Sequence, residues 1–280
     1  MQLRKRKRKT VPQRAGDIMK ITVLTENTTA SDACVAEFGL SLLVEANGCK
    51  VLFDSGQSGV IVPNADALGV DLADVDAAVL SHGHFDHANG FPAFFERNEA
   101  ARLYVHAGYD KPHMKDDEYI GVVPELIGND RVVIAGDRHD LGDGFTIVSY
   151  ADVDPAFPID SAGLDEGEGA ERGPDRFTHE HYLIVEEGDA RVLISGCSHR
   201  GIRNIMRWSA DEGLTHVMGG FHLMGMPVEG GALEEIAAEL LAYPVDYASC
   251  HCTGLDQYRR LKELMGERIR YMAAGDVIEL

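Results

Sequence analysis

This chain of 280 residues lacks long apolar runs and a paired set of cysteines. No apolar stretch approaches the ~20 residues that a membrane-spanning helix needs, and no apolar segment follows the basic start as it would in a signal peptide. We therefore expect neither a membrane anchor nor a secretory leader. The five cysteines are an odd number spread over the chain, which argues against a disulfide framework. Reduced thiols and a soluble chain fit a cytoplasmic protein.

Basic charge is scarce beyond the first fourteen residues. Seven of the 26 Lys and Arg lie at positions 4–9 and 14, which leaves 19 against 46 acidic residues, a net charge of −27 for the remainder. Such a body repels nucleic acids and membrane surfaces. A like-charged terminal run is typical of a disordered arm, so we expect a disordered basic arm at 1–18 and a single domain at 19–280. Association with nucleic acid through the arm stays open as an alternative, which deletion of residues 1–14 would abolish.

An apolar content of 45% is that of an ordinary globular chain, in which predicted strands alternate with helices. Strands are expected at 20–25, 40–45, 50–53, 77–80, 102–106, 181–186, 191–195, 215–223 and 245–254, and helices at 58–68, after His87, up to Trp208 and at 233–241. The pairs Asn47-Gly48 and Gly188-Asp189 predict two hairpins. Two short strands are expected between 132 and 150. The polar stretch 152–179 is too long for a simple connection.

One motif, Ser-His-Gly-His-Phe-Asp-His at 81–87, directly follows the apolar run at 77–80. Three imidazoles and a carboxylate within six residues are donors that a divalent metal prefers. In an extended segment alternate side chains share a face, so His82 and His84 are predicted to bind one ion together. Asp86 and His87 begin the next helix and face a second ion. The pattern is compatible with a two-metal centre, with ions roughly 3.5–4 Å apart.

Three later strand ends present a histidine each: His199, His222 and His251. The ends of neighbouring strands meet at one edge of a sheet, where layered α/β folds commonly place their sites. Cys197 precedes His199 by two residues in a Gly-rich turn. The cysteines on either side of His251 are interpreted as buried packing residues, because structural zinc sites need four ligands at CxxC-like spacing. His106 and His113, with no partner in spacing, are weak candidates.

The motif His-x-His-x-Asp-His at 82–87 resembles the signature of the metallo-β-lactamase fold hydrolases. Residues 51–56 resemble that family's first motif, a strand that ends in an Asp, here Asp54, which supports the metal site. The segments Gly-Cys-Ser-His-Arg-Gly, Gly-Gly-Phe-His-Leu and His-Cys-Thr-Gly are similar to the branch named for dihydropterin ribofuranosylaminobenzene phosphate synthase. The resemblance runs from about Lys20 to the C-terminus.

This resemblance implies an α/β fold, a four-layer αββα sandwich with the metal centre at the edge where its two sheets meet. It implies a divalent metal cofactor, two zinc ions in our interpretation, with manganese or iron also suited to such ligands. Cys197 stands where the family usually has a bridging Asp, and His181 is the fallback for the family's middle-strand His. The expected ligand set is His82, His84, Asp86, His87, His199, His251 and, as a second choice to His199, Cys197.

The expected activity is hydrolysis of an ester, lactone or phosphoester of a small molecule. Asp86 would orient the attacking water, and His222 would transfer a proton to the leaving group. In families of this fold, a long insertion such as 152–179 forms a lid. The alternative is a synthase acting on a pterin and an aryl-ribosyl phosphate. Its phosphate would need basic residues, for which Lys111, Arg200 and Arg203 are the candidates.

Overall fold

The computed structural model describes residues 18–280. Apart from its last residue, the predicted basic arm at 1–18 lies outside the described part of the chain, and so does the alternative of nucleic-acid association through that arm. No helix between residues 18 and 280 is both long enough and apolar enough to cross a membrane.

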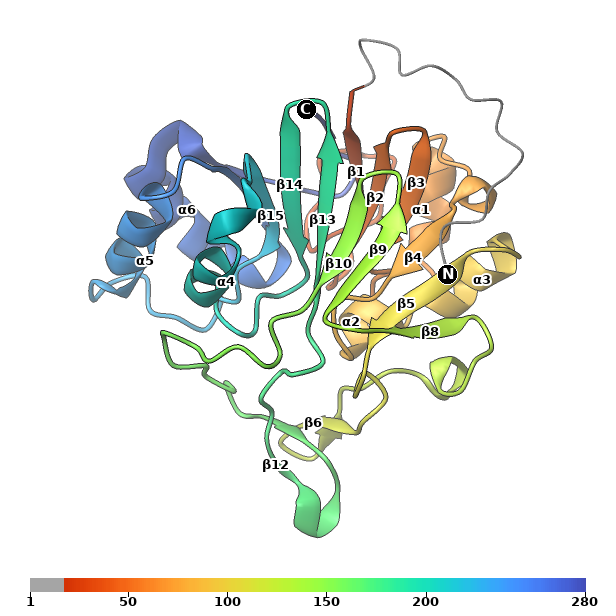
Figure 1. The fold of residues 1–280 in the computed structure, drawn as a ribbon, viewed down its shortest axis with the longest axis horizontal. Coiled ribbons are helices and arrows are strands. Elements are labelled where there is room, and N and C mark those ends of the chain that lie inside the picture. The colour runs from red at the N-terminus through yellow and green to blue at the C-terminus, as the bar shows by residue number, and fades with distance from the viewer. Residues whose placement is uncertain (1–17) are drawn as a thin grey trace.

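Two seven-stranded sheets face each other at the centre of the molecule (Figure 1). The first sheet has the order β18-β1-β2-β3-β4-β5-β8 and the second the order β17-β16-β15-β14-β13-β10-β9. The first is built from β1 (Lys20–Thr25), β2 (Ser41–Ala46), β3 (Cys49–Phe53), β4 (Ala77–Val79), β5 (Arg102–His106), β8 (Val132–Ala135) and β18 (Val277–Glu279). The second is built from β9 (Arg138–Gly142), β10 (Phe145–Val148), β13 (Tyr182–Glu187), β14 (Ala190–Ser195), β15 (His216–Gly220), β16 (Asp246–Cys250) and β17 (Ile269–Tyr271).

Helices cover the outer face of each sheet (Figure 1). On the first sheet these are α1 (Ile61–Ala67), α2 (Phe85–Ala88) and α3 (Phe91–Arg97), and on the second α4 (Ile202–Trp208), α5 (Ala232–Leu241) and α6 (Leu255–Met265). In α5 the buried Leu233, Ile236 and Leu240 recur at helical spacing and pack on the second sheet. Each such side chain contributes roughly 1.5–3 kcal/mol by leaving water. The αββα sandwich expected from the sequence is confirmed.

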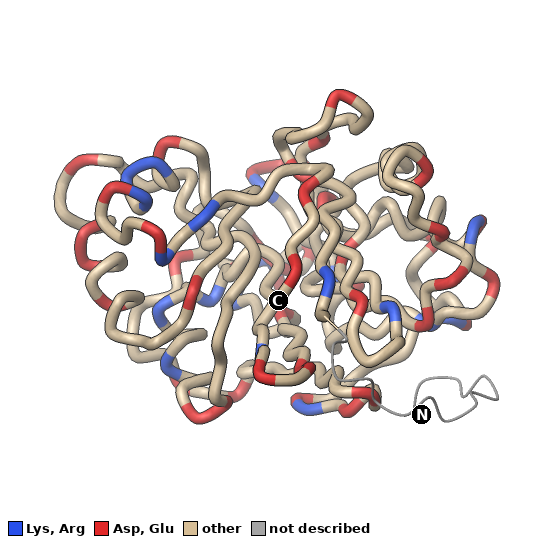
Figure 2. Tube along the Cα trace, turned by 90° about the horizontal axis from the view of Figure 1, so that it is seen from above, with Lys and Arg blue, Asp and Glu red and all other residues tan. Residues whose placement is uncertain are grey.

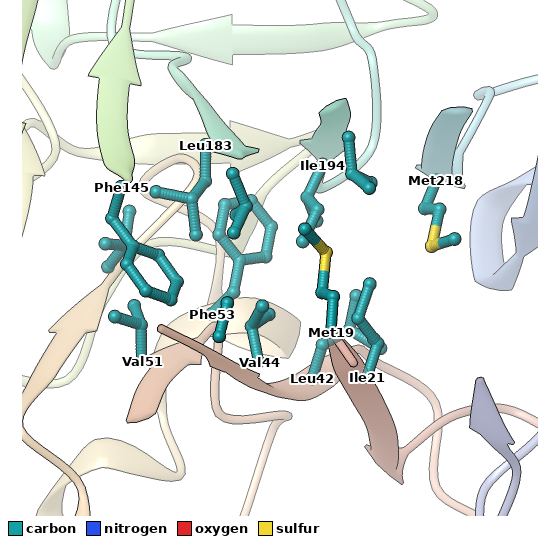
Figure 3. Packing of buried hydrophobic residues seen from close by; sticks show 14 of the residues in the cluster. Met19, Ile21, Leu42, Val44, Val51, Phe53, Phe145, Leu183, Ile194 and Met218 are labelled. Atoms are coloured by element: carbon teal, nitrogen blue, oxygen red, sulfur yellow. The ribbon is translucent and has the colours of Figure 1, made fainter. Parts of the chain in front are cut away.

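The main core lies between the sheets (Figure 3). Val44 and Phe53 of the first sheet meet Leu183 and Ile194 of the second, and all four are fully buried. Since neighbouring residues of a strand point to opposite faces, Leu43 and Leu52 belong to the outer cluster under α1 and α3. Both faces of the central strands are therefore apolar, as expected for sheets covered on two sides.

The predicted hairpin at Asn47-Gly48 joins β2 and β3. Both residues have positive φ, 50° and 72°, which a two-residue turn of type I′ requires. Ala46 pairs with Cys49 across the turn, so the register of the whole hairpin follows from these two residues. The Gly188-Asp189 hairpin between β13 and β14 is likewise present.

The structure differs from expectation around residues 132–179. Three strands, not two, lie between 132 and 148, because the Gly-Asp turn at 142–144 closes a further hairpin of β9 and β10. The stretch 152–179 contains β11 (Leu164–Glu166) and β12 (Gly173–Pro174). These pair with β6 (His113–Lys115) and β7 (Glu118–Tyr119) in a small third sheet that projects below the sandwich in Figure 1.

Candidate metal centre

The predicted motif lies in the turn that connects β4 to α2. Gly83 separates the two histidines because a side chain there would collide with the carbonyl oxygen of Tyr109. His84 is the residue before α2, whose first turn carries Asp86 and His87. The motif is therefore held between a buried strand and a short helix, as the sequence predicted.

The first subsite consists of His82, His84 and His199, which are all buried and whose ligand atoms lie within 4.8 Å of one another. The Nε2 atoms of His82 and His199 are 3.2 Å apart. The ring of His84 lies 4.6 Å from that of His82 and 4.8 Å from that of His199, centroid to centroid. Two ligands from β4's end thus meet one from the end of β14.

The second subsite consists of Asp86, His87, Cys197 and His251. His251 Nε2 lies 3.2 Å from Asp86 Oδ2 and 3.3 Å from His87 Nε2. Cys197 Sγ is 3.1 Å from His87 Nε2. The Cys197 thiol also groups with His199, so it lies between the two subsites. All seven predicted ligands are thereby brought into one place.

These spacings fit a bound cation. Two nitrogens on one tetrahedral zinc, at bonds of about 2.0–2.1 Å, lie roughly 3.3 Å apart, which matches the separations within both subsites. Hydrogen bonds at the far side of the rings fix which nitrogen carries the proton. Where Nδ1 donates to an oxygen, Nε2 keeps its lone pair for the ion. The donor set therefore suits one divalent ion in each subsite.

Asp54 supports two of the histidines. Its Oδ2 accepts a hydrogen bond of 2.6 Å from His87 Nδ1 and another of 2.7 Å from the Ser81 hydroxyl. Ser81 Oγ lies 2.8 Å from His82 Nδ1 and accepts its proton. The support of the metal site predicted for Asp54 is thus seen as a direct hydrogen bond to His87. Asp54 also reaches His82, in the other subsite, through Ser81. Gly196 allows this close approach, since a side chain there would meet Ser81 and Asp54.

His251 is oriented by the end of β1. Asn27 Oδ1 accepts a hydrogen bond of 2.8 Å from His251 Nδ1, and Glu26 Oε1 accepts one of 2.7 Å from the His251 backbone N–H. Glu26 also accepts a hydrogen bond from the Tyr271 hydroxyl. Residues more than 220 positions apart thus fix the last predicted ligand, which lies in a 3₁₀ turn, His251–Thr253, after β16.

Burial and charge set opposite proton affinities in the two subsites. Burial, together with neighbouring histidines, holds the pKa of His82 and of His199 well below the usual value, so both are neutral and ready to bind a metal. Burial would also lower the pKa of His87, but Asp54 and Asp86 raise it to about 9. Burial would raise the pKa of Asp86, yet His87 and His251 lower it. The second subsite thus favours positive charge.

His222 and Cys252 lie beside the two subsites. The His222 ring is 4.2 Å from that of His199, and its Nδ1 has no hydrogen-bond partner within residues 18–280. The ligand atoms of Cys197, His199 and His222 lie within 4.8 Å of one another, so His222 is also within ligand reach. Cys252 Sγ accepts a hydrogen bond of 3.3 Å from the backbone N–H of His222. The same Sγ atom lies within 4.8 Å of ligand atoms of Cys197 and His251. Cys250 and Cys252 are both buried, as expected, and Cys250 belongs to the main core.

His181, the fallback ligand, points elsewhere. Its Nε2 bonds to the carbonyl oxygen of Leu80, and its ring lies 6.0 Å from His106. Burial lowers the pKa of His181 to about 3. The Nε2 atom of His181 is thus engaged with the backbone directly after β4.

A second group of buried donors was missed by sequence reasoning. His113, Asp175 and His179 lie next to His84, with ligand atoms within 4.8 Å. Asp175 and His179 come from the stretch expected to be a lid, and His113 begins β6. Isolated histidines give no spacing signal, so this group could be found only from the fold.

A cavity of about 190 Å³ opens beside His199 and His222. Its other walls come from α4, from the segment after β15 and from Phe157 and Pro158 of the inserted stretch. Asn204 anchors that stretch by exchanging hydrogen bonds of 2.9 Å with the backbone of Phe157.

Two of the three predicted basic candidates are engaged in ion pairs, whereas the Nε and Nη1 atoms of Arg200 have no hydrogen-bond partner among residues 18–280. Arg203 forms an ion pair with Glu239 and lies over the Phe157 ring, and Lys111 pairs with Glu166. Arg200 is buried and donates to the carbonyl oxygen of Val153 at 3.2 Å. Acidic positions are spread over the loops and helices of the described chain (Figure 2), in keeping with its net charge.

The chain matches a known protein family and several known proteins. The model of the metallo-beta-lactamase superfamily matches residues 35–240. The chain is 26% identical to the 7,8-dihydropterin-6-methyl-4-(β-D-ribofuranosyl)-aminobenzene-5′-phosphate synthase of Methanocaldococcus jannaschii, over 94% of this chain and 97% of that protein. It is also 26% identical to an uncharacterised protein of the same organism, over 87% of this chain and 94% of the relative.

A solved structure of a metal-dependent hydrolase of the β-lactamase superfamily superposes with a TM-score of 0.79 at 27% identity, covering 94% of this chain and 99% of the other. The resemblance predicted from the motifs is confirmed. This chain belongs to the metallo-β-lactamase superfamily.

Proposed function

We propose that this protein is a metal-dependent hydrolase with a dinuclear centre, which cleaves an ester, lactone or phosphoester of a small molecule. The observation that carries the proposal is the pair of adjoining subsites, in which seven buried donors face one another at the spacing of metal ligands. In the first subsite His82, His84 and His199 would hold an ion. In the second, Asp86, His87 and His251 would hold another, with Cys197 between the two.

Bound divalent ions would supply Lewis acidity and a water of lowered pKa. Asp86 Oδ2, 3.2 Å from His251 Nε2, would accept a hydrogen bond from that water and orient it toward the substrate. Burial of all these groups excludes bulk water and strengthens their electrostatic effect.

His222 would transfer a proton to the leaving group. Its ring lines the 190 Å³ cavity, and its unpartnered Nδ1 is free to act on a substrate. Burial would lower the pKa of His222, but contact with Cys252 raises it, which keeps a proton available near neutral pH.

Turnover of a panel of generic esters, lactones and phosphodiesters tests the proposal. We expect hydrolysis that is lost after chelation and restored by Zn²⁺ or Mn²⁺. Asp86→Asn should abolish it, while the matched control His216→Gln, at the start of β15, should leave it unchanged. Turnover that survives complete metal removal would refute the proposal.

The synthase activity named for the relative from Methanocaldococcus jannaschii is the second candidate. It is favoured by 26% identity over nearly the whole chain. The ion pairs of Arg203 and Lys111 weigh against it, because a phosphate would have to displace Glu239 or Glu166. Incubation with a dihydropterin and a ribofuranosylaminobenzene phosphate, followed by mass spectrometry, would reveal a joined product if this reaction occurs.

A further inference from the structure

The segment 175–180, at the end of the inserted stretch, contacts both loops that carry the first subsite. His179 Nδ1 accepts the Gly83 N–H at 3.0 Å, between the two histidines of the motif. Phe177 stacks on His199 with ring centroids 4.4 Å apart and planes 12° from parallel. Glu180 Oε1 accepts the His199 backbone N–H at 2.8 Å. This segment therefore supports the candidate ligands and does more than cover them.

Asp175 is the centre of this arrangement. The carboxylate is buried, and its Oδ2 accepts hydrogen bonds from His113 Nδ1 at 2.9 Å and from His179 Nε2 at 3.2 Å. His179 must carry its proton on Nε2, since its Nδ1 already accepts from Gly83. The same Oδ2 lies 3.8 Å from His84 Nε2.

His84 Nε2 is the unsatisfied member of this group. It is buried and has no hydrogen-bond partner among the described residues. A separation of 3.8 Å is too long for a hydrogen bond, but a shift of less than 1 Å would bring it into range. Because Nε2 faces Asp175, Nδ1 is the nitrogen that His84 has left for an ion.

We propose that Asp175 is a positioning residue for the first subsite. Its carboxylate closes on His84 Nε2–H when an ion binds at Nδ1, and so couples metal occupancy to the ordering of residues 152–178. An ion held at Nδ1 would polarise the His84 ring and make Nε2–H a stronger donor to Asp175, which would shorten the contact between them. The inserted stretch then packs more firmly on the first subsite when that subsite holds a metal ion.

This inference rests on the metal site of the proposed function but not on the reaction. Zinc affinity, measured by competition with a chromophoric chelator, tests it. Asp175→Asn should weaken zinc binding about 10–100-fold, the usual range for residues that orient a ligand. Asp165→Asn is the matched control, because Asp165 lies in the same inserted stretch but pairs with Arg172. It should stay within about twofold of wild type.

Two further readouts separate positioning from general support of the fold. In ¹⁵N-histidine spectra of the zinc-loaded wild type, His84 should carry its proton on Nε2, and Asp175→Asn should disturb that signal while leaving His251 unchanged. Amide exchange across 152–178 should slow on addition of zinc in the wild type and in Asp165→Asn, but not in Asp175→Asn.

Three results would overturn the inference. The first is equal zinc affinity for Asp175→Asn and Asp165→Asn. The second is loss of one full equivalent of zinc in Asp175→Asn with the remaining sites unaffected, which would make Asp175 a ligand of its own ion. The third is zinc-independent exchange in the wild type. If the wild type binds no zinc at all, the proposed function fails with it, whereas normal wild-type binding with an unaffected Asp175→Asn refutes this inference alone.

Discussion

Replacing Asp54 by Asn converts one oxygen of a buried carboxylate into an NH₂ group. The side-chain oxygen would keep facing the Ser81 backbone N–H, which donates to Oδ1 at 2.7 Å, so the NH₂ group replaces Oδ2. It then points donors at His87 Nδ1 and at the Ser81 hydroxyl. His87 must move its proton to Nε2, the atom that faces Cys197 and His251. A proton there occupies the lone pair that the ion needs.

The size of the effect follows from the number of ligands disturbed. Loss of one orienting partner costs about 10–100-fold in metal affinity. Asp54 reaches a ligand in each subsite, His87 directly and His82 through Ser81, so the upper end of that range, about 100-fold or 2.7 kcal/mol, is expected for Asp54→Asn. Ser81→Ala breaks the link to His82 alone and should cost about 10-fold.

Zinc affinity by chelator competition measures these effects, with circular dichroism to confirm the fold. Asp71→Asn is the control, because Asp71 caps the backbone N–H of Ala73 in an exposed turn. If Asp54→Asn binds zinc within threefold of the wild type, or no worse than Asp71→Asn, Asp54 is an ordinary turn residue and the reasoning is wrong.

His82→Ala and His84→Ala should each lower the bound metal and abolish hydrolysis while the protein stays folded, so full metal occupancy in both would contradict their role. His251→Ala should also reduce bound metal, whereas His222→Gln should keep it, slow the chemical step and remove one limb of the pH–rate profile. If His222→Gln loses metal as fully as His251→Ala, then His222 is a ligand. Two arginines lower the pKa of Glu212, so its stabilisation is present at neutral pH and is lost on acidification. Glu212→Gln should therefore reduce the free energy of unfolding by about 0.5–1 kcal/mol at pH 7, and urea titrations at successively lower pH should show the difference shrink.

The elements that the sequence predicted well are those with a strong local signal. Asn47-Gly48 predicts a tight turn, and the apolar runs on either side of it predict two strands of a sheet that is covered on both faces. The motif at 82–87 and the strand ends at His199 and His251 were visible because strand ends converge at one sheet edge.

What the sequence could not predict depends on contacts across long separations. Asp175 meets His113 across 62 positions, and His179 meets Gly83 across 96. Neither pairing leaves a periodic pattern, because each depends on where the inserted stretch folds back. The proximity of Cys252 to Cys197 and His251 has a related origin, because Cys252 lies in the 3₁₀ turn after β16, whereas Cys250 is the last residue of that strand and packs in the main core.

The central claim is that two adjoining subsites each hold a divalent ion. Elemental analysis of protein equilibrated with zinc and freed of the excess measures it most directly, for the wild type beside His84→Ala and His251→Ala. We expect about two ions per chain in the wild type and about one in each variant, since each change disables one subsite. A wild type that retains no zinc, or variants that retain as much as the wild type, would contradict the account.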